Sequence, residues 1–326
     1  MSPGLVNFEK NCQVRLMTHH SIPKALAATL LGATCISFAA PFVKWAEMDP
    51  SAIGFYRCLI AAFALLPLVM SVRSTNDQWL GRGARLAFVS GIVFALDLVV
   101  WHKSILDVGA GVATLLANTQ VFWVAIVSAG ALGEKLPRAF WACGLVALLG
   151  ITSLTLPGMT SMRLSPEGVG FGLMAAVFYA GFILLLKASQ KPDDALPLAS
   201  NLFLSSIGST LTLGLAGILE GDQFTSSEPQ TWLALIGLGV VVHVLGWLFI
   251  SSGMPSLPTS LSSIMILFQP VMASIWGILF FGEMWGPVES FGAILTVASI
   301  GLAAKALAKP ETREDLDHGN ASTSRP

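Results

Sequence analysis

Long apolar runs, separated by short polar or Pro/Gly-containing breaks, make up most of the chain. A helix needs about 20 apolar residues to cross a bilayer core of about 30 Å. Ten runs are close to that length, and the segments between them are short. The runs cover residues 25–43, 51–72, 85–102, 108–132, 138–156, 167–186, 196–219, 231–251, 257–281 and 287–307. The pattern predicts an all-α integral membrane protein with ten transmembrane helices.

The composition of the chain favours helices that face lipid. Of its 326 residues, 54% are hydrophobic and 11% are charged, and the mean hydropathy is +0.73. Soluble domains carry about 25% charged residues, so this chain has too little polar surface to coat a globule of its size. The net charge of −1 shows no basic bias toward nucleic acid. The expected partners are therefore the lipid bilayer and a small molecule, and the sequence leaves the oligomeric state open.

Cysteine spacing and sequence motifs give no sign of a metal site or of catalysis. Cys12, Cys35, Cys58 and Cys143 lack paired spacing, and three of them lie in apolar runs, where a thiol behaves as a small hydrophobe. A GxxxxGK[ST] phosphate loop and an HExxH motif are both absent from the sequence. We expect no cofactor, no metal and no enzymatic activity.

Both ends of the chain are polar. Residues 1–23 are predicted to form a cytoplasmic arm, and residues 309–326 a disordered cytoplasmic tail. Lys24 and the apolar run after it have an alternative interpretation as a signal peptide. The run continues past Pro41 through Phe42 and Val43, which favours a retained first span.

The distribution of Lys and Arg predicts the orientation of the spans. With ten spans and the N-terminus inside, 14 of the 18 basic residues fall in inside segments. Only Lys44, Lys103 and Arg163 fall outside, and Arg57 lies within a span. Cytoplasmic segments carry the excess of Lys and Arg. The asymmetry therefore predicts that both termini are cytoplasmic, and it favours an even number of spans.

A repeated spacing divides the chain into two halves. Gln120 and Glu134 lie fourteen residues apart, and so do Gln269 and Glu283, with a glycine before each glutamate. With a three-residue insertion in the second copy, Trp101 in the third span aligns with Trp247 in the eighth. The first spans of both halves end in lysine, at positions 44 and 187. Chance similarity between apolar helices is the alternative to duplication, and the matched spacing favours duplication.

The duplication predicts two halves in opposite orientations. The first half covers residues 24–157 and the second covers 158–308, with five spans each. Because five is an odd number, the second copy must be inverted in the membrane. Inverted repeats recur in secondary transporters, where the substrate site lies near the bilayer midplane at the interface of the repeats.

The stretches LGEKLPRAFWACGLVALLGITSL and FFGEMWGPVESFGAILTVASIGL resemble the two EamA-type repeats of the drug/metabolite transporter superfamily. FYRCLIAAFALLPL resembles the Arg-bearing second span of that family. The resemblance covers residues 25–305. It implies a ten-helix carrier of the bacterial inner membrane that moves a small metabolite by alternating access, often outward, without an ATPase domain.

Three alternatives to an exporter of an amino-acid-like or other polar organic compound remain open. The protein could import a vitamin or a nucleotide-derived metabolite. It could instead be a membrane sensor or a subunit that transports nothing. A sensor or subunit would be expected to carry a soluble domain or a catalytic motif, and the sequence shows neither.

Asp97 is the first candidate site residue, because an ionisable side chain inside a span is costly and is a functional candidate by default. The tryptophan alignment matches Asp97, four residues before Trp101, with His243, four residues before Trp247. Each ionisable group would share a helix face with its tryptophan. We expect Asp97 and His243 to meet across a central cavity, where they would bind substrate or carry a proton. The alternative is a buried polar pair that fixes helix packing.

Arg57, Gln120 and Gln269 complete the candidate set for binding substrate or a proton. Arg57 would either extend its charged end out of the membrane or hold a substrate carboxylate with its planar guanidinium. The two glutamines would bind substrate or hydrogen-bond neighbouring helices. Glu134 and Glu283 lie at span ends, and we interpret them as boundary and packing residues.

Overall fold

The computed structural model describes residues 22–72, 79–155, 165–191, 196–284 and 286–308. The predicted tail, and the predicted arm up to residue 21, lie outside these residues. The described chain is helical, and its main helices in the first half are α2 (Ile22–Ser37), α3 (Ala39–Trp45), α4 (Pro50–Val72), α5 (Arg82–Asn118), α6 (Gln120–Ala131) and α7 (Arg138–Thr155). Those of the second half are α8 (Pro166–Ala188), α9 (Leu198–Glu220), α10 (Pro229–Gly237), α11 (Gly246–Gly253), α12 (Thr259–Ile266), α13 (Phe268–Phe281) and α14 (Pro287–Ala308). A π-helix at Leu238–Leu245 joins α10 to α11, and a 3₁₀ turn follows at Met254–Ser256.

Nine helical segments within the described residues are long and apolar enough to cross a membrane. One of them, Arg82–Ala131, is 50 residues long and contains a break at Gly109, whose φ of 78° and ψ of 161° are not helical. Glycine adopts a positive φ without the steric cost that a side chain brings. The long segment therefore holds two spans. The fold is the predicted all-α bundle of ten spans in two inverted five-helix halves.

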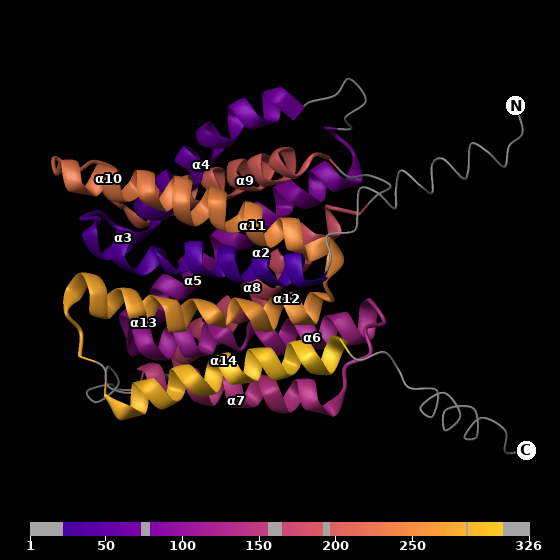
Figure 1. Ribbon diagram of the computed structural model, residues 1–326. Coiled ribbons are helices and arrows are strands. Elements are labelled where there is room, and N and C mark those ends of the chain that lie inside the picture. The colour runs from indigo at the N-terminus through magenta and orange to yellow at the C-terminus, as the bar shows by residue number, and fades with distance from the viewer. Residues whose placement is uncertain (1–21, 73–78, 156–164, 192–195, 285, 309–326) are drawn as a thin grey trace, which may run out of the picture.

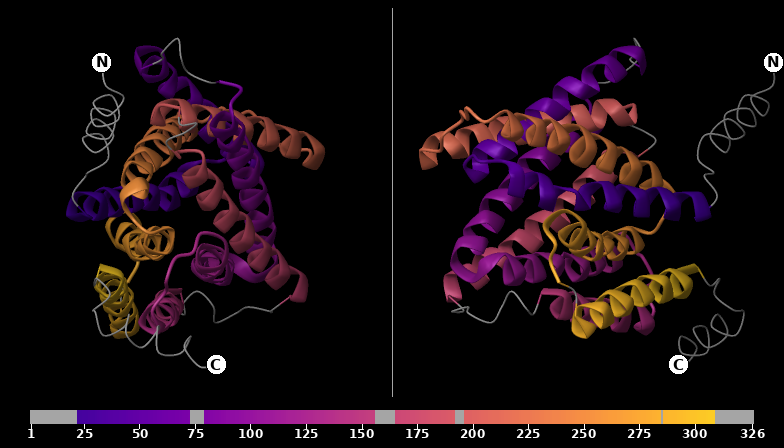
Figure 2. Two further views of the ribbon diagram at one scale, coloured as in Figure 1. Left: turned by 90° about the vertical axis from the view of Figure 1, so that its right-hand side faces the viewer. Right: turned by 60° about the vertical axis from the view of Figure 1, so that its left-hand side comes forward.

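The helices of the two halves are interleaved across the bundle. Helix α5 packs along α8 and α9, α4 packs along α9, and α2 packs along α11. Helices α7 and α14, the last span of each half, pack against each other. Figure 1 places them together at one edge of the bundle, with α4 at the opposite edge, and both views of Figure 2 keep that order.

Glycine allows helices of opposite halves to approach closely. A Cβ placed on Gly91 of α5 would lie 1.8 Å from the carbonyl oxygen of Ser205 in α9. The hydroxyl of Ser209 donates to the carbonyl of Gly91 at 2.8 Å. Small residues with interhelical hydrogen bonds are the usual means of helix association in a bilayer. This crossing fixes α5 against α9.

The fourth span of each half is interrupted near its middle. In the first half the interruption is at Thr119, between α5 and α6, and in the second it is at Leu267, between α12 and α13. Both residues have nearly the same dihedral angles, with φ and ψ of −63° and −7° at Thr119 and −62° and −5° at Leu267. Discontinuous helices in corresponding positions of the two halves are a common feature of transporter binding sites.

Candidate functional site

A cavity of about 540 Å³ lies among α2–α5 of the first half and α8, α11 and α13 of the second. Its polar and aromatic lining residues are Ser37, Lys44, Arg57, Phe94, Asp97, Trp101, His102, Thr114, Asn118, Tyr179, Trp247 and Gln269. The other lining residues are apolar or glycine. Five of the seven predicted site residues therefore surround one cavity of the size of a small-molecule site.

The cavity opens toward one end of the bundle. We call this the Lys44 end; the opposite end, where Lys187 and the start of α12 lie, is the Lys187 end. The lining runs from Lys44 and Ala110, which are exposed, to Tyr179 and Trp247 at mid-bundle. A solute could therefore enter from the Lys44 end.

Arg57 and Asp97 place a guanidinium and a carboxyl group on two neighbouring walls of the cavity. Arg57 comes from α4 and is 9% exposed, and Asp97 comes from α5 and is 7% exposed. The two groups interact electrostatically, yet they do not form an ion pair within 4.0 Å. Among the described residues the Nε of Arg57 has no hydrogen-bond partner. Arg57 does not extend out of the membrane; it presents unused donors close to the cavity.

An aromatic cluster forms the mid-bundle end of the cavity. The guanidinium carbon of Arg57 lies 5.4 Å from the ring centre of Phe94. Trp247 packs edge-on against Phe182, with 4.5 Å between ring centres, and Tyr179 contacts both rings. Aromatic rings supply a rigid apolar surface, and their faces attract cations. The cavity therefore combines separated charges with an apolar, aromatic base.

His243 lies behind the cavity wall, and the expected contact with Asp97 is not formed. It belongs to the π-helix at Leu238–Leu245 and is 3% exposed. Its Nε2 is hydrogen-bonded to the hydroxyl of Ser206 at 3.1 Å, and its ring packs edge-on against Phe94. Among the described residues no hydrogen bond or ion pair joins Asp97 to His243. Asp97 lines the cavity as expected, whereas the side chain of His243 is directed at Ser206 and Phe94.

The two glutamines of the repeat occupy different surroundings. Gln269 lines the cavity, and its amide lies 3.5 Å from the hydroxyl of Tyr179. Gln120 is fully buried outside the cavity, where its amide donates to the carbonyl of Ser263 at 3.1 Å. Gln120 thus joins the two interrupted spans, α6 and α12, as the helix-packing alternative expected.

Sequence reasoning singled out only five of the twelve polar and aromatic lining residues. Asn118 lines the cavity, whereas Gln120, two residues later, faces away from it. Tyr179 was not singled out, because a lone tyrosine in a span gives no signal by itself. His102, near the end of its predicted span, also lines the cavity.

Glu134 lies at the Lys187 end, where it binds the start of α12. Its carboxylate accepts hydrogen bonds from the backbone N–H groups of Thr259 and Ser260 at 2.6 and 3.2 Å, and from the Ser260 hydroxyl at 2.7 Å. Lys187 donates to the carbonyl of Leu257 at 2.6 Å, one residue before that helix. Burial alone would raise the pKa of Glu134, but the hydrogen bonds from Ser260 and Thr259 outweigh it and lower the pKa below 4.5. Glu134 is thus a charged cap on α12.

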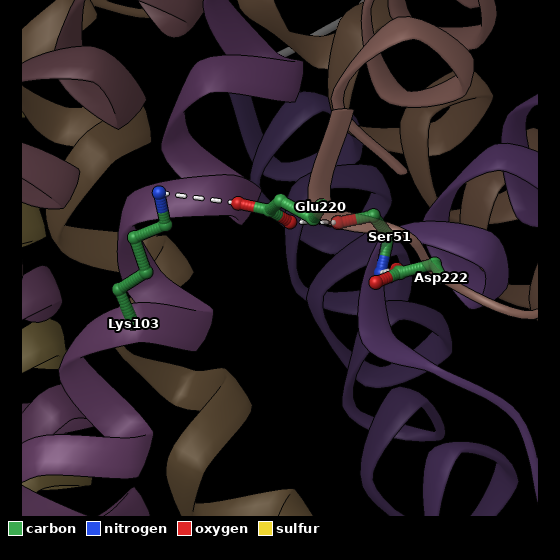
Figure 3. A network of polar contacts seen from close by, with 4 residues as sticks. All are labelled: Ser51, Lys103, Glu220 and Asp222. Carbon is green, nitrogen blue, oxygen red and sulfur yellow. Dashed lines mark hydrogen bonds and ion pairs between the residues drawn. The ribbon is translucent and has the colours of Figure 1, made fainter. Parts of the chain in front are cut away.

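Two ion pairs join neighbouring segments at the Lys44 end. Lys44 lies 3.3 Å from Glu283, and both side chains are more than half exposed. Figure 3 shows Lys103 reaching from α5 to Glu220, the last residue of α9, at 3.1 Å. The other oxygen of Glu220 accepts from the Ser51 hydroxyl at 3.0 Å. This network ties α4, α5 and α9 together beside the open cavity.

A ten-span bundle of two inverted halves around a central cavity is the architecture of a membrane transporter. The model of the EamA-like transporter family matches residues 23–156 and 166–304. The chain therefore belongs to the EamA-like transporter family, and the predicted relation to the drug/metabolite transporter superfamily is confirmed.

Two curated relatives and one solved structure are similar to this chain over most of its length. It is 25% identical to the uncharacterized transporter YwfM of Bacillus subtilis, over 81% of this chain and 88% of that protein. It is also 25% identical to the pseudopaline exporter CntI of Pseudomonas aeruginosa, over 78% of this chain and 86% of that protein. A solved crystal structure shares the fold with a TM-score of 0.72 and 18% identity, over 87% of this chain and 99% of that one.

Proposed function

We propose that the protein is a carrier that moves a small, polar, amino-acid-like metabolite by alternating access between its two halves, without ATP. The observation that carries this proposal is the separated pair of Arg57 and Asp97 in a cavity that opens at one end and ends at an aromatic cluster at mid-bundle. A solute with a carboxylate and an ammonium group could bind Arg57 through the carboxylate and Asp97 through the ammonium at the same time. Its apolar part would rest on the aromatic base formed by Phe94 and Trp247.

The Lys187 end is proposed to face the cytoplasm of a bacterial cell, with both termini on that side of the plasma membrane. The excess of Lys and Arg in the segments of that end supports this orientation. The conformation described here is then open to the outside. Export is the proposed direction, supported by the exporter from Pseudomonas aeruginosa among the relatives. Import of a vitamin or nucleotide-derived metabolite, and a role as a sensor or subunit, are the competing functions.

Transport is tested in proteoliposomes loaded with a panel of zwitterionic, anionic and cationic metabolites. We expect flux of a zwitterionic solute without ATP. Asp97→Asn should abolish most of that flux. Asp107→Asn is the matched control, because Asp107 lies on the same helix, is exposed and does not line the cavity. No flux of any solute would favour the sensor or subunit, and equal losses in the two variants would remove Asp97 from the site.

Proton coupling through Asp97 is a separate part of the proposal. Asp97 lies in the cavity within electrostatic reach of Arg57, so a proton bound to its carboxylate would change the charge that the substrate meets. An imposed pH gradient should then drive wild-type flux but not the residual flux of Asp97→Asn. Wild-type flux that ignores the gradient would establish facilitated diffusion instead.

A further inference from the structure

The two ends of the bundle carry the same backbone motif. Gly133 and Gly282 have φ angles of 68° and 65°, which favour glycine. The next residue in each half is a glutamate, and its N–H turns back six positions: Glu134 to the carbonyl of Ser128 at 2.9 Å, and Glu283 to that of Gly277 at 3.2 Å. The same helix ending therefore presents one carboxylate at each end of the bundle.

The two carboxylates differ in what they bind. Glu134 is about half buried and accepts three hydrogen bonds at the start of α12. Glu283 has a side chain that is 57% exposed, and Lys44 is its ion-pair partner. Two copies of one motif thus have different partners: one carboxylate is bound at a helix start and the other is paired with a lysine.

The repeat identifies the helix start that Glu283 would meet. Gln269 follows Gln120 by 149 positions, and Glu283 follows Glu134 by the same number. The same offset relates Thr259 and Ser260 to residues 110 and 111, just after the break at Gly109. The first N–H groups of a helical segment lack intrahelical acceptors and favour a carboxylate. Ala110 lies on the cavity wall, so a carboxylate bound there would stand at the cavity mouth.

A lysine accompanies the carboxylate at both ends. Lys187, at the end of α8, donates to the carbonyl of Leu257. By the same 149-residue offset the counterpart of Leu257 is Val108, and the first span of the other half ends with Lys44. Lys44 lines the cavity mouth and is more than half exposed, so it is free to change partners.

We propose that Glu134 and Glu283 are two alternating latches, one at each end of the bundle. In the opposite conformation Glu283 leaves Lys44 and caps the segment that begins at Ala110 and Gly111. Lys44 then donates to the carbonyl of Val108, while Glu134 and Lys187 release the start of α12. This inference rests on the proposed alternating access and names the residues that hold each state.

The two latches are unequal. Ser260 adds a hydroxyl donor to the Glu134 latch, whereas Ala110 and Gly111 offer Glu283 only backbone N–H groups. One additional hydrogen bond to a charged group favours the closed Lys187 end by about tenfold or more. The conformation with the cavity open at the Lys44 end is therefore the resting state, in agreement with the structure.

The experiment uses two cysteine reporters that the repeat itself pairs. Thr114 lines the open cavity, and its counterpart 149 positions later is Ser263, which is fully buried. Each is changed to cysteine in a variant without the native cysteines, and labelling by a soluble maleimide is timed in detergent. Thr114→Cys should react fast and Ser263→Cys slowly. Equal rates would contradict a closed Lys187 end.

Removing each latch should shift the reporters in predictable directions. Glu134→Gln should raise labelling at Ser263→Cys by more than about tenfold and lower it at Thr114→Cys, and Ser260→Ala should act in the same sense by about tenfold. In the Glu283→Gln variant, labelling at Ser263→Cys should stay slow. Adding Glu283→Gln to Glu134→Gln should restore fast labelling at Thr114→Cys. Glu167→Gln, an exposed glutamate at the start of α8, is the matched control and should change neither reporter.

These outcomes separate the latches from the transport function. Labelling needs no substrate, so a latch response without flux would contradict the transport proposal alone. Flux without any labelling response to Glu134→Gln would overturn the latches alone. A rise at Ser263→Cys in the Glu283→Gln variant would also overturn them, because the second latch must hold the opposite state.

Discussion

Replacing Gly91 by alanine should disrupt the crossing of α5 and α9. Both helices are well formed there, so the new methyl group has no flexible neighbour to displace. Its Cβ would lie 1.8 Å from the carbonyl oxygen of Ser205 and 2.9 Å from the amide nitrogen of Ser209. Real Cβ atoms essentially never approach within 3.0 Å, so the two backbones must separate.

The size of the effect follows from three contributions. Forcing extra volume into a packed contact costs about 1–3 kcal/mol. Separation of the helices also breaks the bond from Ser209 to the Gly91 carbonyl, and such bonds contribute about 0.6–1.7 kcal/mol in membranes. Alanine regains about 1 kcal/mol of helix propensity. We expect Gly91→Ala to lower the free energy of unfolding by about 1–3 kcal/mol.

The assay is unfolding in mixed detergent micelles, with Gly130→Ala as the matched control. Gly130 lies in α6, is exposed, and a Cβ there would meet nothing within 4 Å. The control should be as stable as the wild type or slightly more stable. If Gly91→Ala has the same free energy of unfolding as the control, the close approach of α5 and α9 does not stabilise the bundle, and the reasoning is wrong.

Two further predictions concern charge and the repeated glutamines. Because hydrogen bonds lower the pKa of Glu134, the latch should stabilise the protein fully above pH 4.5 and lose its contribution as the pH falls through the lowered value. Lys187 is the charged group that faces Glu134 from α8, and melting curves of wild type and Glu134→Gln should converge at low pH. Gln269→Leu should weaken substrate binding at little cost in melting temperature. Gln120→Leu should lower the melting temperature, because it removes the bond to Ser263.

The bundle could be predicted from the sequence because hydrophobic length is itself the physical requirement for crossing a bilayer. The spans at 51–72 and 138–156 correspond to α4 and α7 to within a residue at each end. The repeat was visible because the same helix ending requires a positive φ in both halves. That requirement favours glycine at position 133 and again at position 282. Structural requirements of the backbone, such as span length and a positive φ, are therefore visible in the sequence.

The interior of the site could be predicted only in part. Periodicity places a residue on a helix but does not determine which neighbour its face meets. His243 sits on a π-helix, where the helical turn is wider, so spacing counted at 3.6 residues per turn does not apply. Asn118 lies at the interruption beside Thr119, where the face changes between one helical segment and the next. The sequence patterns give no indication of these local departures from the α-helix.

The two halves contribute chemically different side chains to the lining of the cavity. Lys44, Arg57, Asp97 and His102 all belong to the first half. The second half contributes only groups such as the rings of Tyr179 and Trp247 and the amide of Gln269. The two halves share the Gly-Glu helix ending, but the charged groups that line the cavity lie in the first half. The charge preference of the cavity could therefore be redesigned on α3, α4 and α5 alone, leaving the second half of the chain unchanged.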